Sequence, residues 1–127
     1  MRLFGITNCD TVKRARAWLV QQGAQGVFYD FKKAGVPSAA LDRWIAAVGW
    51  QPLVNRQGST WRKLGAAARA AVVDADSARA LMLAQPSVIK RPVVEWPDGG
   101  VTLGFDADAW ASRLKRRPAP PRAGTVK

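Results

Sequence analysis

The chain has 127 residues, 48% of them hydrophobic, which is enough for one compact domain with a core but too short to expect two. It contains one cysteine and no histidine, which excludes an internal disulfide, a histidine-bound zinc ion and any Cys-His catalytic dyad. The net charge of +11 favours anionic partners, without choosing among nucleic acid, phosphate and an anionic small thiol. No apolar run is long enough to cross a membrane and no secretory signal is present, so we expect a cytoplasmic protein with no membrane partner.

The first thirty residues predict a β-α-β unit. "RLFGI" at 2–6 is a short apolar run typical of a buried strand. Apolar residues then recur at helical spacing and predict a helix from about Asp10 to Gln22, with Gly23 at its end. "GVFYDF" from Gly26 alternates aromatic and β-branched residues, as a second strand would. We expect the two strands to be parallel, with a right-handed crossover.

The middle of the chain, about residues 37–86, predicts a helical insertion of three helices. Ser38 is a candidate N-cap for the first helix, which ends near Gly49. The alanine-rich segments "WRKLGAAARAAVV" and "DADSARALMLAQP" predict the other two, the last with Asp76 or Ser77 near its start.

The end of the chain predicts a hairpin, a helix and a tail. Apolar runs flank Pro97-Asp98-Gly99-Gly100, a strong hairpin signal, and Asp106 or Asp108 can start a final helix through Leu114. We therefore predict one α/β domain over residues 1–116, in the order β-α-β, helical insertion, β-β-α. Residues 117–127 are rich in proline, alanine and basic residues and predict a disordered tail.

Cys9 lies in the predicted loop between the first strand and its helix. The free N–H groups and the positive dipole at the start of a helix favour a thiolate there. The alternative is an inert small core residue, which is the commoner fate of a lone cysteine. Position alone leaves both readings open.

Four motifs in order carry a resemblance to a known family: "GITNCDTVKRARAWL" around Cys9, "GSTWRKL" at 58–64, "IKRP" at 89–92 and the closing "LGF". Over about residues 2–115 the chain resembles the arsenate reductase (ArsC/Spx) family, and most closely its YffB-type branch. The resemblance implies a thioredoxin-like fold interrupted by the helical insertion, with Cys9 as the nucleophile. It also implies a cis Arg91-Pro92 bond facing the thiol, with Arg91 supplying fixed positive charge and Pro92 shaping the cleft.

The sequence departs from the arsenate-reducing members at two of their three oxyanion-binding arginines. Arg91 matches one of them, whereas Gln51 and Phe105 stand at the others. Gln51 can still donate hydrogen bonds but Phe105 cannot. This departure weakens the case for arsenate reduction, unless Arg56 or Arg62 supplies the missing charge from the insertion.

Val12 stands where the Spx-type regulators of the family carry the second cysteine of a Cys-x-x-Cys pair, so no local disulfide can form. We therefore expect monothiol chemistry, in which Cys9 attacks a mixed disulfide or an oxidised substrate and a glutathione thiol resolves the adduct. Glutathione is the expected co-substrate, with glutaredoxin as a further partner and no tightly bound cofactor or metal.

The predicted catalytic residues are Cys9 and Arg91. The predicted substrate-binding residues lie on either side of the thiol: Asn8, Thr11, Lys13, Arg91 and Pro92. Asn8 and Thr11 can hydrogen-bond the sulfur or cap the helix, and Lys13 is one turn beyond Cys9. Lys13 and its neighbour Arg14 can equally belong to a solvated helix face.

Two further functions stay open. One is arsenate reduction with glutathione and glutaredoxin, and the other is a non-enzymatic, Spx-like regulatory protein that binds RNA polymerase. Nucleic acid ranks last as a partner, because the basic residues are dispersed, no recognition motif is present and the tail accounts for part of the charge.

Overall fold

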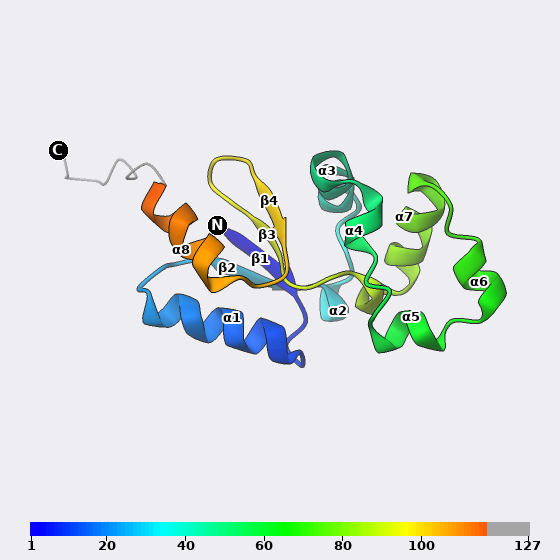
Figure 1. Ribbon diagram of the computed structural model, residues 1–127, viewed down its shortest axis with the longest axis horizontal. Coiled ribbons are helices and arrows are strands. Elements are labelled where there is room, and N and C mark those ends of the chain that lie inside the picture. Colours follow the sequence, from blue (N-terminus) through cyan, green and yellow to red (C-terminus); the bar gives the residue numbers. More distant parts are fainter. Residues whose placement is uncertain (117–127) are drawn as a thin grey trace.

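The structure is a computed structural model that describes residues 1–116; the predicted disordered tail at 117–127 lies outside the described residues. Along the chain the elements are β1 (Arg2–Gly5), α1 (Asp10–Gln21), β2 (Val27–Asp30), α2 (Phe31–Ala34), α3 (Ser38–Val48), α4 (Trp50–Leu53), α5 (Ser59–Lys63), α6 (Ala66–Ala70), α7 (Ala75–Ala84), the 3-10 helix η1 (Pro86–Val88), β3 (Val93–Glu95), β4 (Val101–Leu103) and α8 (Ala107–Arg116) (Figure 1).

The strands form one mixed sheet in the order β2-β1-β3-β4. β1 and β2 are parallel, as predicted, because α1 carries the chain back between them. β3 runs antiparallel to β1, and β3 and β4 form the predicted hairpin. The sheet and its helices confirm the α/β, thioredoxin-like fold expected from the sequence.

Alternate side chains of the central strands face opposite layers, because successive side chains of a strand point to opposite faces. Leu3 and Val94 pack with Ala15 and Leu19 of α1 and with Trp110 of α8. This first core layer therefore lies between the sheet and the helices α1 and α8.

The other face of the sheet is covered by the helical insertion (Figure 1). Phe4 and Val93 belong to a second core cluster with Leu41 and Trp44 of α3, and the ring centroids of Phe4 and Trp44 are 4.9 Å apart in an edge-to-face contact. Burial of these aromatic and aliphatic side chains holds the insertion against the sheet.

The helical content of the insertion was predicted correctly, but its division into three helices was wrong. Between residues 38 and 84 the structure has five helices, α3 to α7. The segment predicted as one helix over "WRKLGAAARAAVV" breaks at Leu64 and Gly65, where the backbone is extended. The guanidinium of Arg69 donates hydrogen bonds to the carbonyls of Arg62 and Leu64, which the break leaves without helical partners.

One predicted helix cap differs in the structure, and two other helices start where the sequence predicts. Pro37 and not Ser38 occupies the N-cap of α3. Asp76 and Ser77 lie near the start of α7, as predicted; Asp74 is its N-cap, and Ser77 completes a capping box. Asp106 starts α8, accepting a hydrogen bond from the Ala109 N–H at 3.1 Å. In the described part of the chain no helix has the length and apolar character needed to span a membrane.

Candidate active site

Cys9 occupies the N-cap of α1, directly after the first strand and its short loop. Its backbone is extended, with φ −143° and ψ 122°, and its carbonyl accepts the Lys13 N–H at 2.9 Å, which starts the helix. The thiol is half-buried and makes no side-chain capping hydrogen bond to the helix N–H groups. The sulfur therefore receives no direct capping hydrogen bond, which is one of the influences that the sequence suggested.

The thiol opens into a cavity of about 400 Å³. Four segments distant in sequence form its wall: the start of α1, the residue Asn55 after α4, the Lys90–Arg91 pair before β3, and the end of β4 with the β4–α8 loop. The lining residues are Cys9, Thr11, Arg14, Asn55, Lys90, Arg91, Leu103, Gly104, Phe105 and Asp106. The thiol therefore shares this cavity with three cationic side chains and one carboxylate.

The segment that brings Lys90 and Arg91 to the cavity is tied to the insertion by backbone pairing. Val54 and Ile89 form an isolated antiparallel bridge, the Asn55 N–H donates to the Val88 carbonyl at 2.8 Å, and the Lys90 N–H donates to the Leu53 carbonyl at 2.9 Å. The insertion thus fixes the position of the cavity wall as well as covering the sheet.

Pro92 is fully buried next to the cavity and does not line it. The Arg91-Pro92 bond is cis, as the resemblance implies. The Pro92 carbonyl accepts the Gly104 N–H at 2.9 Å, which fastens the β4–α8 loop beside Arg91. Gly104 has φ +77°, a conformation that favours glycine.

Phe105 forms an apolar part of the wall. Its ring packs edge-on against Trp110 of α8 at 4.9 Å between centroids and lies 5.9 Å from Trp18 of α1. These contacts fix the aromatic ring in the cavity wall. Gln51, at the start of α4, is not among the lining residues.

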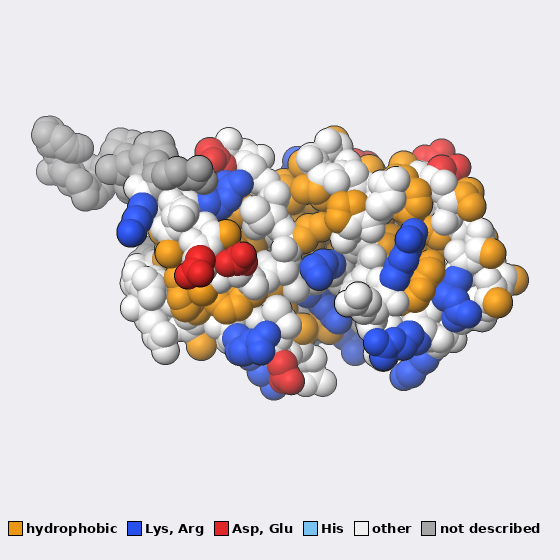
Figure 2. Space-filling view, in the orientation of Figure 1, with side chains coloured by type: hydrophobic (Ala, Val, Ile, Leu, Met, Phe, Trp, Pro, Cys, Tyr) orange, Lys and Arg blue, Asp and Glu red, His pale blue; other side chains and the backbone are white. Residues whose placement is uncertain are grey.

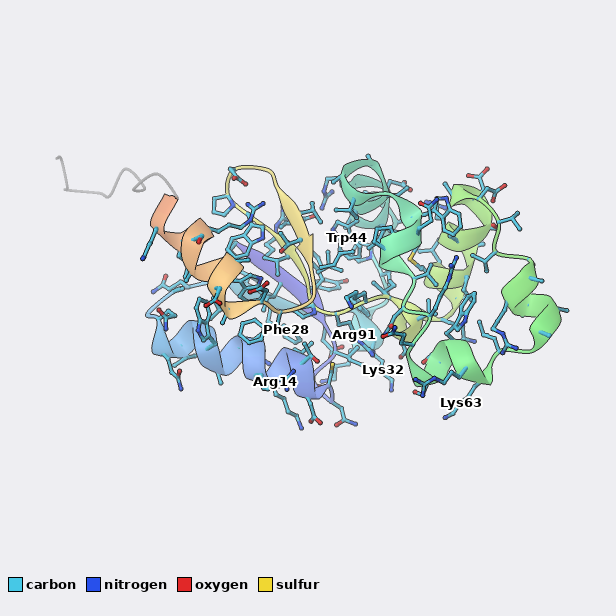
Figure 3. All side chains as sticks on the ribbon, viewed as in Figure 1. Arg14, Phe28, Lys32, Trp44, Lys63 and Arg91 are labelled. Atoms are coloured by element: carbon cyan, nitrogen blue, oxygen red, sulfur yellow. The ribbon has the colours of Figure 1, made fainter. Side chains whose placement is uncertain are left out.

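Some of the predicted site residues line the cavity and others do not. Cys9, Thr11 and Arg91 line the cavity, whereas the exposed side chains of Asn8 and Lys13 do not. Arg14, which the sequence leaves open between the site and a solvated helix face, lines the cavity. Figure 3 shows Arg14 and Arg91 on the same side of the molecule.

Sequence reasoning missed Asn55, Lys90 and Asp106. Lys90 directly precedes Arg91 in the "IKRP" motif, so its place was open to prediction. Nothing in the sequence marks Asn55, because its position depends on the bridge between Val54 and Ile89. Arg56 and Arg62, considered as sources of missing charge, do not line the cavity; the additional cations are Arg14 and Lys90.

The β2-β1-β3-β4 sheet, the cysteine at the start of α1 and the cis-proline segment beside it define a thioredoxin-like protein with a single-thiol site. Within that class, this chain belongs to the ArsC family, which it matches over residues 4–112.

Known relatives agree with the family and with its YffB-type branch. A solved structure of a protein named YFFB is 46% identical, with a TM-score of 0.81, over 89% of this chain and 97% of that one. The solution structure of an arsenate reductase (ArsC) related protein from Brucella melitensis is 47% identical, with a TM-score of 0.70, over 90% of this chain and 93% of that one. An uncharacterised protein of Haemophilus influenzae is 33% identical over 104 residues, which are 82% of this chain and 90% of that protein.

Proposed function

We propose that this protein is a glutathione-dependent monothiol oxidoreductase in which Cys9 is the nucleophile. The observation that carries the proposal is the shared cavity of Cys9, Arg14, Lys90 and Arg91 in a chain with no second cysteine. Membership of the ArsC family supports thiol-dependent reductase chemistry in general.

The proposed reaction has two exchange steps. The Cys9 thiolate attacks the glutathione sulfur of a mixed disulfide; a Cys9–glutathione disulfide forms, and the substrate sulfur leaves as a thiolate that takes a proton from water. A second glutathione thiolate then attacks the bound glutathione sulfur, releasing oxidised glutathione and the Cys9 thiolate. The second thiol must come from outside, because Val12, at the fourth position of the cysteine motif, is a fully buried hydrocarbon side chain.

The charges of the cavity match those of glutathione. Glutathione carries two carboxylates and one ammonium group, and the cavity offers cations at Arg14, Lys90 and Arg91 and a carboxylate at Asp106. Two cations can bind the carboxylates, Asp106 can bind the ammonium group, and the remaining cation stabilises the sulfur anion. Thr11 and Asn55 add hydrogen-bonding groups to the same wall.

Incubation with oxidised glutathione, followed by mass spectrometry of the intact protein, tests the proposal. We expect one glutathione adduct on Cys9, none on Cys9→Ser, and removal of the adduct by reduced glutathione. The matched reference is the same protein unfolded in denaturant, whose cysteine should react more slowly at about pH 6.5, where an ordinary thiol is mostly protonated. If the folded and unfolded proteins react at the same rate, the site does not activate the thiol and the proposal fails.

Arsenate reduction is the second candidate, favoured by the three cations around the thiol, which can hold an oxyanion. Arsenate takes two electrons from two thiols and yields arsenite, a disulfide and water. Phe105 argues against it, because its apolar ring lines the cavity and cannot bind an oxyanion, whereas the resemblance implies an arginine at this position in arsenate-reducing members. Arsenite production with glutathione and glutaredoxin supplied, compared with the Cys9→Ser variant, separates the two activities.

A further inference from the structure

Among the described basic residues, those in salt bridges lie apart from those at the Cys9 cavity. Ion pairs join Arg2 and Arg43 to Glu95, Arg79 to Asp42 and Arg113 to Asp98, and none of these four arginines lines the Cys9 cavity. The cations at and beside the cavity make no salt bridge within residues 1–116. Their charge is therefore available to a partner.

We define the basic surface as six such side chains from five segments of the chain: Arg14, Lys32, Arg56, Lys63, Lys90 and Arg91. All are exposed except Arg91, which is half-buried. Figure 3 shows Arg14, Lys32 and Lys63 along the lower side of the view, from α1 to α5, with Arg91 above them near the middle. Figure 2 shows Lys and Arg side chains (blue) spread over the same part of the molecule.

Packing of the insertion makes this surface continuous with the cavity. Both α2, which carries Lys32, and α5, which carries Lys63, contact η1, and η1 leads directly into Lys90 and Arg91. Arg56 follows Asn55 of the cavity wall, and its guanidinium lies over the ring of Trp61 in α5, 5.6 Å from the centroid. A partner lying along α5 and α2 would thus reach the mouth of the cavity.

Few carboxylates oppose this charge. No aspartate or glutamate occurs between Asp42 and Asp74, which includes all of α4, α5 and α6. Asp30 is engaged as the N-cap of α2, where its carboxylate accepts the Lys32 N–H at 3.0 Å. Asp10 lies in the first turn of α1 and Asp106 in the cavity wall. Six cations against these three carboxylates leave a positive field, which speeds the association of anionic partners.

We propose that the basic surface binds an acidic segment of a protein substrate while the modified cysteine of that substrate enters the Cys9 cavity. The inference rests on the proposed function and names its substrate class: proteins glutathionylated on a cysteine close to aspartate and glutamate residues. A protein partner fits better than nucleic acid. The reaction needs a sulfur on the partner, which a nucleic acid does not offer.

Two glutathionylated peptides of equal length test the proposal, one with aspartate and glutamate around the cysteine and one with asparagine and glutamine in their place. We expect kcat/KM to be about tenfold higher for the acidic peptide at low ionic strength, with the advantage shrinking as salt is added. Lys63→Glu should remove most of that advantage and leave the rate with the neutral peptide within about twofold.

Lys115→Glu is the matched control, because Lys115 is also an exposed lysine in the last turn of a helix and lies outside the basic surface. Equal rates for the two peptides, or an equal loss in Lys115→Glu, would overturn the proposal. So would a single-stranded oligonucleotide that binds the basic surface more tightly than the acidic peptide does. Fluorescence anisotropy measures binding of the reduced acidic peptide to Cys9→Ser, in which no thiol exchange can occur. A failure of docking is thereby distinguished from a failure of the proposed thiol exchange.

Discussion

Trp44 donates its indole N–H to the carboxylate of Glu95 over 2.9 Å, joining α3 of the insertion to β3 of the sheet. The carboxylate of Glu95 also forms salt bridges with Arg43 at 3.0 Å and with Arg2 at 3.3 Å. The side chain of Glu95 is only 12% exposed. Water therefore competes weakly for these hydrogen bonds, and the carboxylate holds three segments of the chain together.

Trp44→Phe keeps an aromatic ring in the core but removes the hydrogen bond to Glu95. We expect the free energy of unfolding to fall by about 1.5–3 kcal/mol, the usual contribution of a hydrogen bond to a charged group. Urea unfolding followed by circular dichroism measures the change. Asp42→Asn, which breaks the exposed ion pair with Arg79, should cost less than about 1 kcal/mol; an equal loss in both variants would contradict the special role of Glu95.

Gly5 lets β1 approach α1 closely. A Cβ atom at this position would lie 2.9 Å from a methyl group of Val12, which is fully buried and has no room to move. We expect Gly5→Ala to lower the free energy of unfolding by about 1–3 kcal/mol through overpacking. Gly65→Ala is the control, since nothing lies within 4 Å of its added methyl group, and its effect should stay within about 0.5 kcal/mol. Equal melting temperatures for both variants would show that the strand can shift away from the helix.

The fold could be predicted where the sequence contains local signals. The short apolar run at 2–6, the helical spacing from Val12 to Leu19 and the Pro97–Gly100 turn each specify their element without help from distant residues. The insertion could not be divided correctly, because alanine-rich sequence favours helix throughout. At the break, the side chain of Arg69 donates hydrogen bonds to the carbonyls of Arg62 and Leu64, and no periodicity records such contacts.

The carboxyl group of Asp74 makes the stability of α7 depend on pH. Hydrogen bonds from the backbone N–H of Ser77 at 2.8 Å and from its hydroxyl at 2.7 Å lower the pKa of Asp74 below its ordinary 3.8. A lowered pKa in the folded state means that the stabilisation is present at neutral pH and is lost as the pH falls through 3.8 and below.

Asp74→Asn tests this dependence, because asparagine caps a helix as well as aspartate but does not titrate. Thermal unfolding of both proteins between about pH 6 and about pH 2 isolates Asp74, since the other carboxylates titrate in both. We expect the melting temperature of the original protein to fall relative to the variant on acidification. A difference that is independent of pH would show that Asp74 acts only as a neutral hydrogen-bond acceptor.

The candidate site was predictable only where its residues belong to a motif. Cys9 and Arg91 come from recognisable segments, and both line the cavity. Lys13 was chosen by its spacing from Cys9, but the direction of α1 turns Arg14 toward the cavity instead. Asp106 was assigned to start a helix, which it does, and only the folded chain places the same carboxylate beside the thiol.

Asp106 therefore offers the sharpest test of how glutathione binds in the proposed reaction. Asp106→Asn keeps a capping residue for α8 and removes the charge expected to bind the ammonium group. We expect KM for glutathione to rise about threefold to fivefold, a modest change because the carboxylate is exposed. Asp108→Asn is the control, because it removes an equal charge in the first turn of the same helix but outside the cavity, and it should leave KM unchanged.

A glutathione analogue with hydrogen in place of the amino group separates charge from shape. Its KM should be the same for the original protein and for Asp106→Asn, because the analogue has no ammonium group for Asp106 to bind. If KM for that analogue rises as much as KM for glutathione, Asp106 acts through the shape of the cavity and not through its charge.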